Sequence, residues 1–175
     1  NRYFDVFIEY AKATHEDILI RITAHNRGPD FAELHVLPTI WFRNTWSWTP
    51  HAPRPTLNRD EDLGDAQVIH LNHEQYGSRW LLCEGTPELL FTENDTNTQR
   101  LYGLPNASPY VKDGINDSIV AGTKETVNPE QVGTKAAVHY HPLIAPGQCV
   151  TYRLRLTNLP PTEGQLGEEF ETIFP

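Results

Sequence analysis

The chain of 175 residues contains no methionine and only two cysteines. Cys83 and Cys149 lie far apart and form no C-x-x-C pair, and two cysteines do not make a disulfide-rich scaffold. We therefore expect reduced thiols in a cytoplasmic protein, with one long-range disulfide as the alternative. Position 1 is Asn, and a strand-like run begins almost at once, so we expect a segment of a longer protein.

Long apolar runs and cationic residues are also scarce. No apolar run reaches the ~18–20 residues of a membrane span. Lys and Arg number 14 against 23 Asp and Glu, which gives a net charge of −9. An acidic surface repels phosphate backbones and anionic headgroups, so we expect neither nucleic acid nor a membrane as a partner.

The dominant hydrophobic period is two residues. Apolar and polar side chains alternate over 4–10, 18–24 and 150–156. This period is typical of antiparallel strands with one face in the core and the other in water. Positions 4, 6, 8 and 10 therefore form a predicted core face of the first strand.

Turn residues divide the rest of the chain into further strands. A turn at 26–30 precedes a predicted strand from about Ala32 to Trp46, and a turn at 145–148 predicts a hairpin between 136–144 and 149–157. Weaker strands are predicted at 67–72, 79–83 and 88–92. The pattern predicts an all-β fold, an antiparallel β-sandwich (supersandwich-like) of about eight to twelve strands with long loops and a short C-terminal helix.

Two segments lack this alternation. The stretch 92–128 is rich in Asn, Asp, Gly and Thr, and it predicts a long ordered loop with one or two short elements. After Pro160 and Pro161, residues 167–174 have an amphipathic helical pattern with Phe170, Ile173 and Phe174 on one side. We therefore divide the chain into a β-sandwich domain, 1–159, and the start of a linker helix, 160–175.

Three of the four tryptophans fall within 41–48. On a continued strand Trp46 and Trp48 share a face, and aromatic faces of this kind stack on sugar rings. The alternative is packing in the core or against a neighbouring domain. Arg43 and Asn44 are unusual in a dry core and favour an interface or the rim of a site.

His139 and His141 have metal-like spacing, since residues i and i+2 of a strand share a face. Together with Gly133 they match the start of the cupin metal motif, but the motif's Glu and its downstream His are missing. A solvent-facing or interface pair is therefore the preferred interpretation, and we expect no cofactor. The other histidines, including His35, show no ligand clustering in the sequence.

Paired carboxylates could perform glycosidase chemistry, and several acidic residues fall in or near the long loop, namely Glu84, Glu88, Glu93, Asp95, Asp113 and Asp117. The sequence places no two of them at the required separation. The loop segment 106–117 is rich in side chains that bond hydroxyl groups. It could enter a neighbouring sugar pocket, or it could be a structural loop in which Asn and Asp satisfy their own turns.

Several blocks carry a resemblance to a known family: 2–7, 9–13, 16–22, 37–48 (LPTIWFRNTWSW) and 108–116 (SPYVKDGIN). They resemble one segment of large bacterial glucosidases of glycoside hydrolase family 63, which includes processing α-glucosidase I and mannosylglycerate hydrolase. The resemblance covers nearly the whole chain.

That family joins an N-terminal β-sandwich to an (α/α)6 barrel, which holds the acid and base of an inverting hydrolysis. The resemblance implies a non-catalytic sandwich that packs on the barrel and shapes its site, with a carbohydrate such as an α-glucoside as the substrate. No residue here matches the catalytic acid or base. The candidate substrate-binding or interdomain residues are Tyr110, Lys112, Asp113, Asn116, Trp46 and Trp48. The alternatives are a stand-alone carbohydrate-binding module with Trp46 and Trp48 as its platform, and a cupin-like metal protein using His139 and His141.

Overall fold

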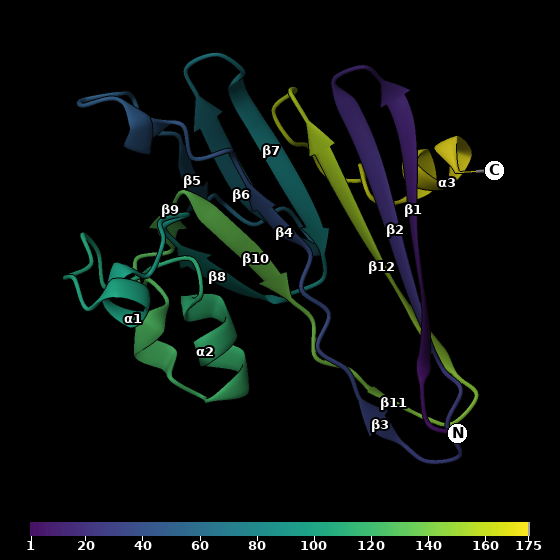
Figure 1. The fold of residues 1–175 in the computed structure, drawn as a ribbon. Coiled ribbons are helices and arrows are strands. Elements are labelled where there is room, and N and C mark those ends of the chain that lie inside the picture. Colours follow the sequence, from purple (N-terminus) through teal and green to yellow (C-terminus); the bar gives the residue numbers. More distant parts are fainter. Residues whose placement is uncertain (175) are drawn as a thin grey trace.

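A computed structural model describes residues 1–174, and it is all-β, with twelve strands and a few short helices in that range (Figure 1). The strands are Phe4–Thr14 (β1), Asp17–Asn26 (β2), Ala32–Glu33 (β3), Thr39–Trp41 (β4), Thr56–Arg59 (β5), Ala66–His73 (β6), Gly77–Glu84 (β7), Glu88–Thr92 (β8), Val132–Gly133 (β9), Lys135–His139 (β10), Leu143–Ile144 (β11) and Cys149–Thr157 (β12). The helices are Trp46–Trp48 (η1), Thr98–Tyr102 (α1), Gly114–Val120 (α2), Lys124–Thr126 (η2) and Glu168–Ile173 (α3). The predicted all-β class is confirmed, and none of these helices is long and apolar enough to cross a membrane.

The strands form a large sheet and two small ones. The large sheet has the order β1-β2-β12-β7-β6-β5-β9, a three-stranded sheet has the order β4-β10-β8, and β11 pairs with β3. Every pairing between these strands is antiparallel. Figure 1 shows the three-stranded sheet facing the β5–β7 part of the large sheet, which gives the two layers of a sandwich.

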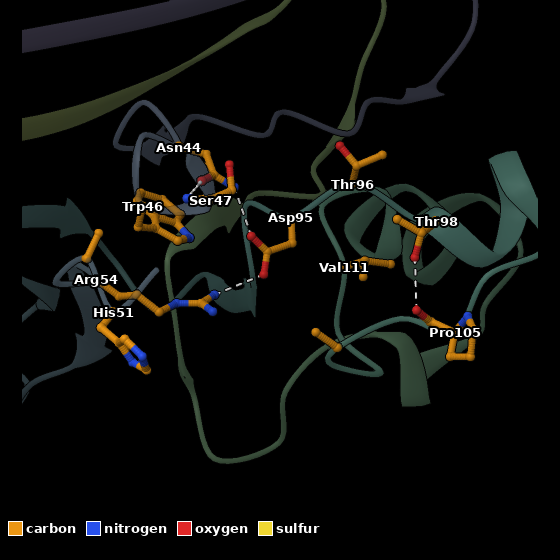
Figure 2. Close-up of a pocket in the computed structure, with 12 residues that line it drawn as sticks. Asn44, Trp46, Ser47, His51, Arg54, Asp95, Thr96, Thr98, Pro105 and Val111 are labelled. Carbon is orange, nitrogen blue, oxygen red and sulfur yellow. Dashed lines mark hydrogen bonds and ion pairs between the residues drawn. The ribbon is translucent and has the colours of Figure 1, made fainter. Parts of the chain in front are cut away.

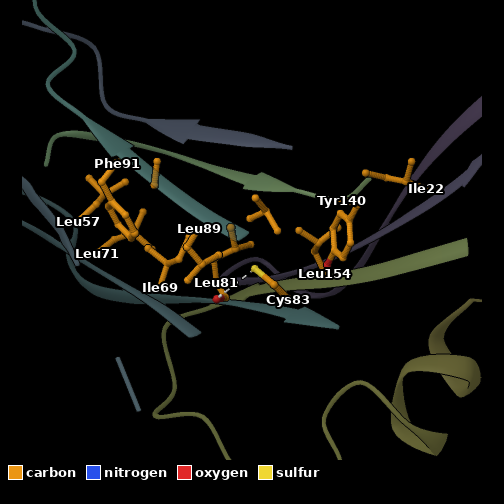
Figure 3. Close-up of a cluster of buried hydrophobic side chains, with 12 residues drawn as sticks. Ile22, Leu57, Ile69, Leu71, Leu81, Cys83, Leu89, Phe91, Tyr140 and Leu154 are labelled. Carbon is orange, nitrogen blue, oxygen red and sulfur yellow. Dashed lines mark hydrogen bonds between the residues drawn. The ribbon is translucent and has the colours of Figure 1, made fainter. Parts of the chain in front are cut away.

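The core lies between these two layers. The large sheet contributes Ile69, Leu81 and Leu154, and the small sheet contributes Phe91 and Val138, all nearly or fully buried. Figure 3 shows this cluster, in which the side chains of the two sheets interdigitate. Such a core supplies most of the stability of a two-layer fold, because each buried aliphatic or aromatic side chain contributes about 1.5–3 kcal/mol.

The opposite face of the large sheet is covered by the C-terminal helix. Phe170 and Phe174 of this region are buried against Leu19, Val68 and Leu82. The predicted amphipathic helix therefore exists, and its apolar side packs on the sandwich itself. Its role as the start of a linker to another domain stays a prediction, and Pro175 lies outside the described residues.

Arg155 forms a buried ion pair within the large sheet and also contacts α3. Arg155 of β12 donates Nε to Asp17 Oδ1 at 2.9 Å and Nη2 to Asp17 Oδ2 at 2.6 Å, and the two side chains are 5% and 7% exposed. The same Nη2 also donates to Glu169 Oε1 of α3 at 2.9 Å. Arg155 therefore joins β12, β2 and the helix through charge-assisted hydrogen bonds.

The first strand differs from its prediction. Its apolar residues Val6, Ile8 and Tyr10 are 47%, 55% and 69% exposed, although the alternation places them on a core face. The three-stranded sheet is too narrow to extend over β1, so that edge of the inner face stays open. A groove of about 270 Å³ runs along it, with Ile20 and Ile40 also in its wall.

Two local predictions are wrong. The expected strand 32–46 is broken into β3 and β4, and the chain then turns into η1 instead of continuing as a strand. The turn at 145–148 exists, with Gln148 N donating to Ala145 O at 3.1 Å, but it joins no hairpin. The chain changes sheets there, because β11 pairs with β3 whereas β12 lies between β2 and β7.

Candidate functional site

A cavity of about 570 Å³ lies beside η1, between the loop that follows β4 and the long segment that follows β8 (Figure 2). The cavity has polar and apolar walls. Its lining is Asn44, Trp46, Ser47, His51, Ala52, Arg54, Asp95, Thr96, Thr98, Pro105, Ala107 and Val111. Two sequence blocks that are far apart, 37–48 and 108–116, therefore meet at one site.

The side chain of Asn44 explains why the chain turns here. Its Oδ1 accepts a hydrogen bond from Ser47 N at 3.1 Å, an arrangement that favours a turn over an extended strand. The turn separates the two tryptophans of η1. Trp46 is 8% exposed and lines the cavity, whereas Trp48 is 65% exposed and lies 5.0 Å from the Arg43 guanidinium. The two indoles thus do not share a face, as they would on a strand.

Asp95 is the centre of the polar wall. Its Oδ1 accepts from Asn44 Nδ2 at 2.8 Å, and its Oδ2 accepts from Arg54 Nη2 at 2.9 Å. The Asn44 amide also donates to the carbonyl of Asn94 at 2.9 Å. Both carboxylate oxygens are thereby fixed in position, and each keeps capacity to accept a further hydrogen bond from a ligand.

Arg54 connects two carboxylates at the edge of the cavity. Its Nη2 also donates to Glu93 Oε2 at 2.9 Å, and Glu93 accepts from Thr134 Oγ1 at 2.7 Å. Burial disfavours the charge of Arg54, but the hydrogen bonds and charges of Asp95 and Glu93 outweigh it and raise the pKa of the guanidinium. An arginine shared by two carboxylates holds these side chains in position and can bind a ligand, but it does not suit proton transfer.

The indole nitrogen of Trp46 is an unusual group. It is buried and has no hydrogen-bond partner among residues 1–174. Buried donors in folded proteins are nearly always paired, so this unpaired N–H beside the cavity is an exception. The Arg54 guanidinium lies 5.7 Å from the same indole ring.

The structure separates the six predicted binding residues. Trp46 lines the cavity, and Lys112 reaches its rim through a hydrogen bond from Nζ to Thr96 Oγ1 at 3.1 Å. Trp48 and Asn116 are exposed, Tyr110 is half-buried, and none of these three is part of the cavity lining.

Asp113, the remaining predicted residue, belongs to a neighbouring network of hydrogen bonds between α1 and the start of α2. It accepts from Asn97 Nδ2 at 3.1 and 3.2 Å and from Arg100 Nη1 at 2.6 Å. Arg100 also pairs with Asp117 of α2, which fixes α1 to α2. Asp113 therefore serves local structure in the described part of the chain.

Sequence reasoning missed Arg54 and Thr96 as wall residues. It named Asp95 among six carboxylates and marked Asn44 as unusual in an aromatic segment, and these two form the central contact. The polar residue inside the tryptophan-rich run was the useful signal. Arg54 carried none, because a lone arginine near prolines is typical of any surface loop.

A second cluster contains three histidines. His139 and His141 flank Tyr140, and His35 stacks on His141 with a centroid distance of 3.9 Å. The expectation that His35 belongs to no ligand cluster is therefore wrong. It failed because His35 and His139 are brought together by strand pairing across 104 positions of sequence. Burial, His141 and His139 together lower the pKa of His35.

Comparison with known proteins gives one informative relative. No protein-family model matches the chain. The uncharacterized protein YMR196W of Saccharomyces cerevisiae is 36% identical over 188 residues, which cover 91% of this chain. The chain spans only 17% of the length of that relative. The similarity thus extends along nearly all of this chain and places it beside one part of a much longer protein.

Proposed function

We propose that this chain is the non-catalytic β-sandwich segment of a larger inverting glycoside hydrolase, and that the cavity beside Trp46 forms part of its sugar-binding surface. One observation carries the proposal. The two blocks with the most specific resemblance to family 63 glucosidases meet at this cavity although they are far apart in the sequence: 37–48 contributes Asn44, Trp46 and Ser47 to its lining, and 108–116 contributes Val111.

The chemistry of the cavity supports a carbohydrate ligand. A volume of about 570 Å³ lies within the range of small-ligand pockets, about 300–1,000 Å³. Asp95 and Asn44 offer fixed hydrogen-bonding groups for hydroxyls. The apolar parts of Trp46 and Val111 can contact the C–H groups of a sugar ring.

The open edge of the sandwich supports a neighbouring domain. The exposed side chains of Val6, Ile8 and Tyr10 form a contiguous apolar strip along β1, and large exposed apolar patches usually mark interaction sites. In the parent protein we assign the catalytic (α/α)6 barrel as the partner of this face. The relative's much greater length leaves room for such a domain.

Calorimetric titration of the isolated chain with maltose tests the sugar site. We expect weak binding, with Kd on the order of 1 mM, and at least a tenfold loss in Asp95→Ala. Asp62→Ala is the matched control, since Asp62 also pairs with an arginine, Arg59, but lies outside the cavity lining. Equal affinity in the wild type and Asp95→Ala would show that the cavity is not the sugar-binding site.

Hydrolysis assays on the longer parent protein test the assignment to a glycosidase. We expect α-glucoside hydrolysis with inversion, and a lower rate when Asp95 or Lys112 is replaced by Ala. A parent that hydrolyses no glycoside, combined with maltose binding by this chain, would favour the stand-alone carbohydrate-binding module instead. The cavity is common to both functions, so only this pair of measurements separates them.

A further inference from the structure

Three histidines converge where the chain passes between the small sheets. Val36 and Tyr140 form an isolated antiparallel bridge, with N–O distances of 2.9 and 3.0 Å in the two directions. In antiparallel pairing this register sets His35 opposite His141, and His139 occupies the same face two residues away. The backbone therefore directs three imidazoles to one side of the bridge.

The imidazole nitrogens are close enough to share an ion. One nitrogen from each of His35, His139 and His141 lies within 4.8 Å of the others, and His35 Nδ1 is 2.9 Å from His139 Nε2. Around a tetrahedral zinc ion with Zn–N bonds of about 2.0–2.1 Å, ligand nitrogens lie about 3.3 Å apart. The three rings are stacked at 10–16° to one another, so binding requires the imidazoles to rotate until their nitrogens point at one ion.

The outer surroundings of His139 are those of a metal ligand. Its Nδ1 lies 3.0 Å from Glu88 Oε2, and its side chain is only 9% exposed. Glu88 lies on strand β8 directly opposite His139, and its Oε1 accepts a hydrogen bond from Lys124 Nζ at 3.0 Å. A carboxylate on one ring nitrogen fixes the tautomer and turns the other nitrogen, Nε2, toward the metal.

Room for a fourth ligand exists beside His141. Its Nε2 lies 3.7 Å from the exposed carboxylate of Glu33, at the end of β3. Three histidines with a water in the remaining position match the ligand set of zinc sites that keep an open position, whereas a carboxylate there completes a four-coordinate site. Imidazole-rich sites select zinc, copper or nickel over magnesium and calcium.

We propose that His35, His139 and His141 bind a zinc ion, with Glu88 positioning His139 and with Glu33 or a water as the fourth ligand. The ion would join the segment before β4 to the end of β10 and so stabilise the junction of the small sheets. The site shares no residue with the Trp46 cavity, so the inference is independent of the glycosidase proposal.

Titration of the chelator-treated, metal-free chain with zinc chloride tests the site. We expect one zinc per chain with micromolar or tighter affinity, a higher Tm on zinc addition and no response to magnesium. His35→Ala and His141→Ala should each weaken binding at least tenfold, and Glu88→Gln should weaken it about 10–100-fold as an outer-shell partner. His15→Ala is the matched control, because its side chain is 90% exposed and lies outside the cluster.

Cobalt substitution provides a second readout. A tetrahedral cobalt spectrum that disappears in His35→Ala, while circular dichroism shows an intact fold, supports the assignment. Absence of zinc binding at millimolar concentration by the folded wild type would overturn it. Binding that persists unchanged in the double variant His35→Ala/His141→Ala would overturn it as well.

Discussion

Asn44 and Asp95 are 51 positions apart in the sequence, and a hydrogen bond of 2.8 Å joins their side chains at the wall of the cavity. Asn44 Nδ2 also donates to the Asn94 carbonyl, and Asn44 Oδ1 accepts from Ser47 N. One side chain thus starts the η1 turn and attaches it to the segment after β8. The shape of the candidate sugar site depends on this contact.

Replacing Asn44 with Ala should destabilise the chain by about 1–2 kcal/mol, because the turn loses its side-chain acceptor and Asp95 loses a donor. Denaturant unfolding followed by tryptophan fluorescence measures the change. Asn116→Ala is the control, since Asn116 is exposed on α2 and its loss should alter stability by less than about 0.5 kcal/mol. Equal effects of the two variants would contradict the bracing role of Asn44.

Replacing Asp17 with Ala should cost about 3–5 kcal/mol, because it leaves the Arg155 guanidinium buried with the exposed Glu169 as its one charged partner among residues 1–174. Chemical denaturation at neutral pH measures the loss. The surface pair of Arg2 and Asp30 provides the comparison, with side chains 81% and 61% exposed. Asp30→Ala should cost no more than about 1 kcal/mol, as is usual for exposed pairs.

Replacing Phe170 with Ala should cost about 3–5 kcal/mol and release α3 from the sheet, because Phe170 is fully buried against Leu19 and Leu82. Hydrogen exchange should show faster exchange of helix amides near Phe174. Thr172→Ala, on the exposed side of the same helix, should leave the exchange nearly unchanged. Protection that survives Phe170→Ala would show that the helix is held by other contacts.

The two thiols should differ in reactivity. Cys83 is fully buried and its pKa is raised by burial, whereas Cys149 is exposed, and both are free thiols. Since the thiolate is the reactive species, iodoacetamide should modify one thiol per native chain and two per denatured chain. Mass spectrometry identifies the labelled cysteine. If Cys83 were labelled in the native chain as fast as Cys149, the burial of Cys83 in strand β7 would be contradicted.

The strands with clear alternation could be predicted from the sequence. The period of two located β1, β2 and β12, and the short apolar runs located β6, β7 and β8. The amphipathic pattern of Phe170, Ile173 and Phe174 likewise predicted a helix with one apolar side. These features depend on neighbouring residues, which the sequence displays directly.

Pairing between distant segments could not be predicted in this way. The alternation of β1 does not reveal that the facing sheet is too narrow to cover Val6 and Ile8. The spacing of His139 and His141 is visible in the sequence, but the arrival of His35 depends on the bridge between Val36 and Tyr140.

The sequence by itself determined that this protein is an all-β chain with an acidic surface, because alternation and charge are local properties. Only the tertiary structure decided which polar residues meet. Long-range strand pairing brought Asn44 to Asp95 and His35 to His139, and the turn at Asn44 separated Trp46 from Trp48. Such contacts depend on the register between distant strands, which the local pattern leaves open.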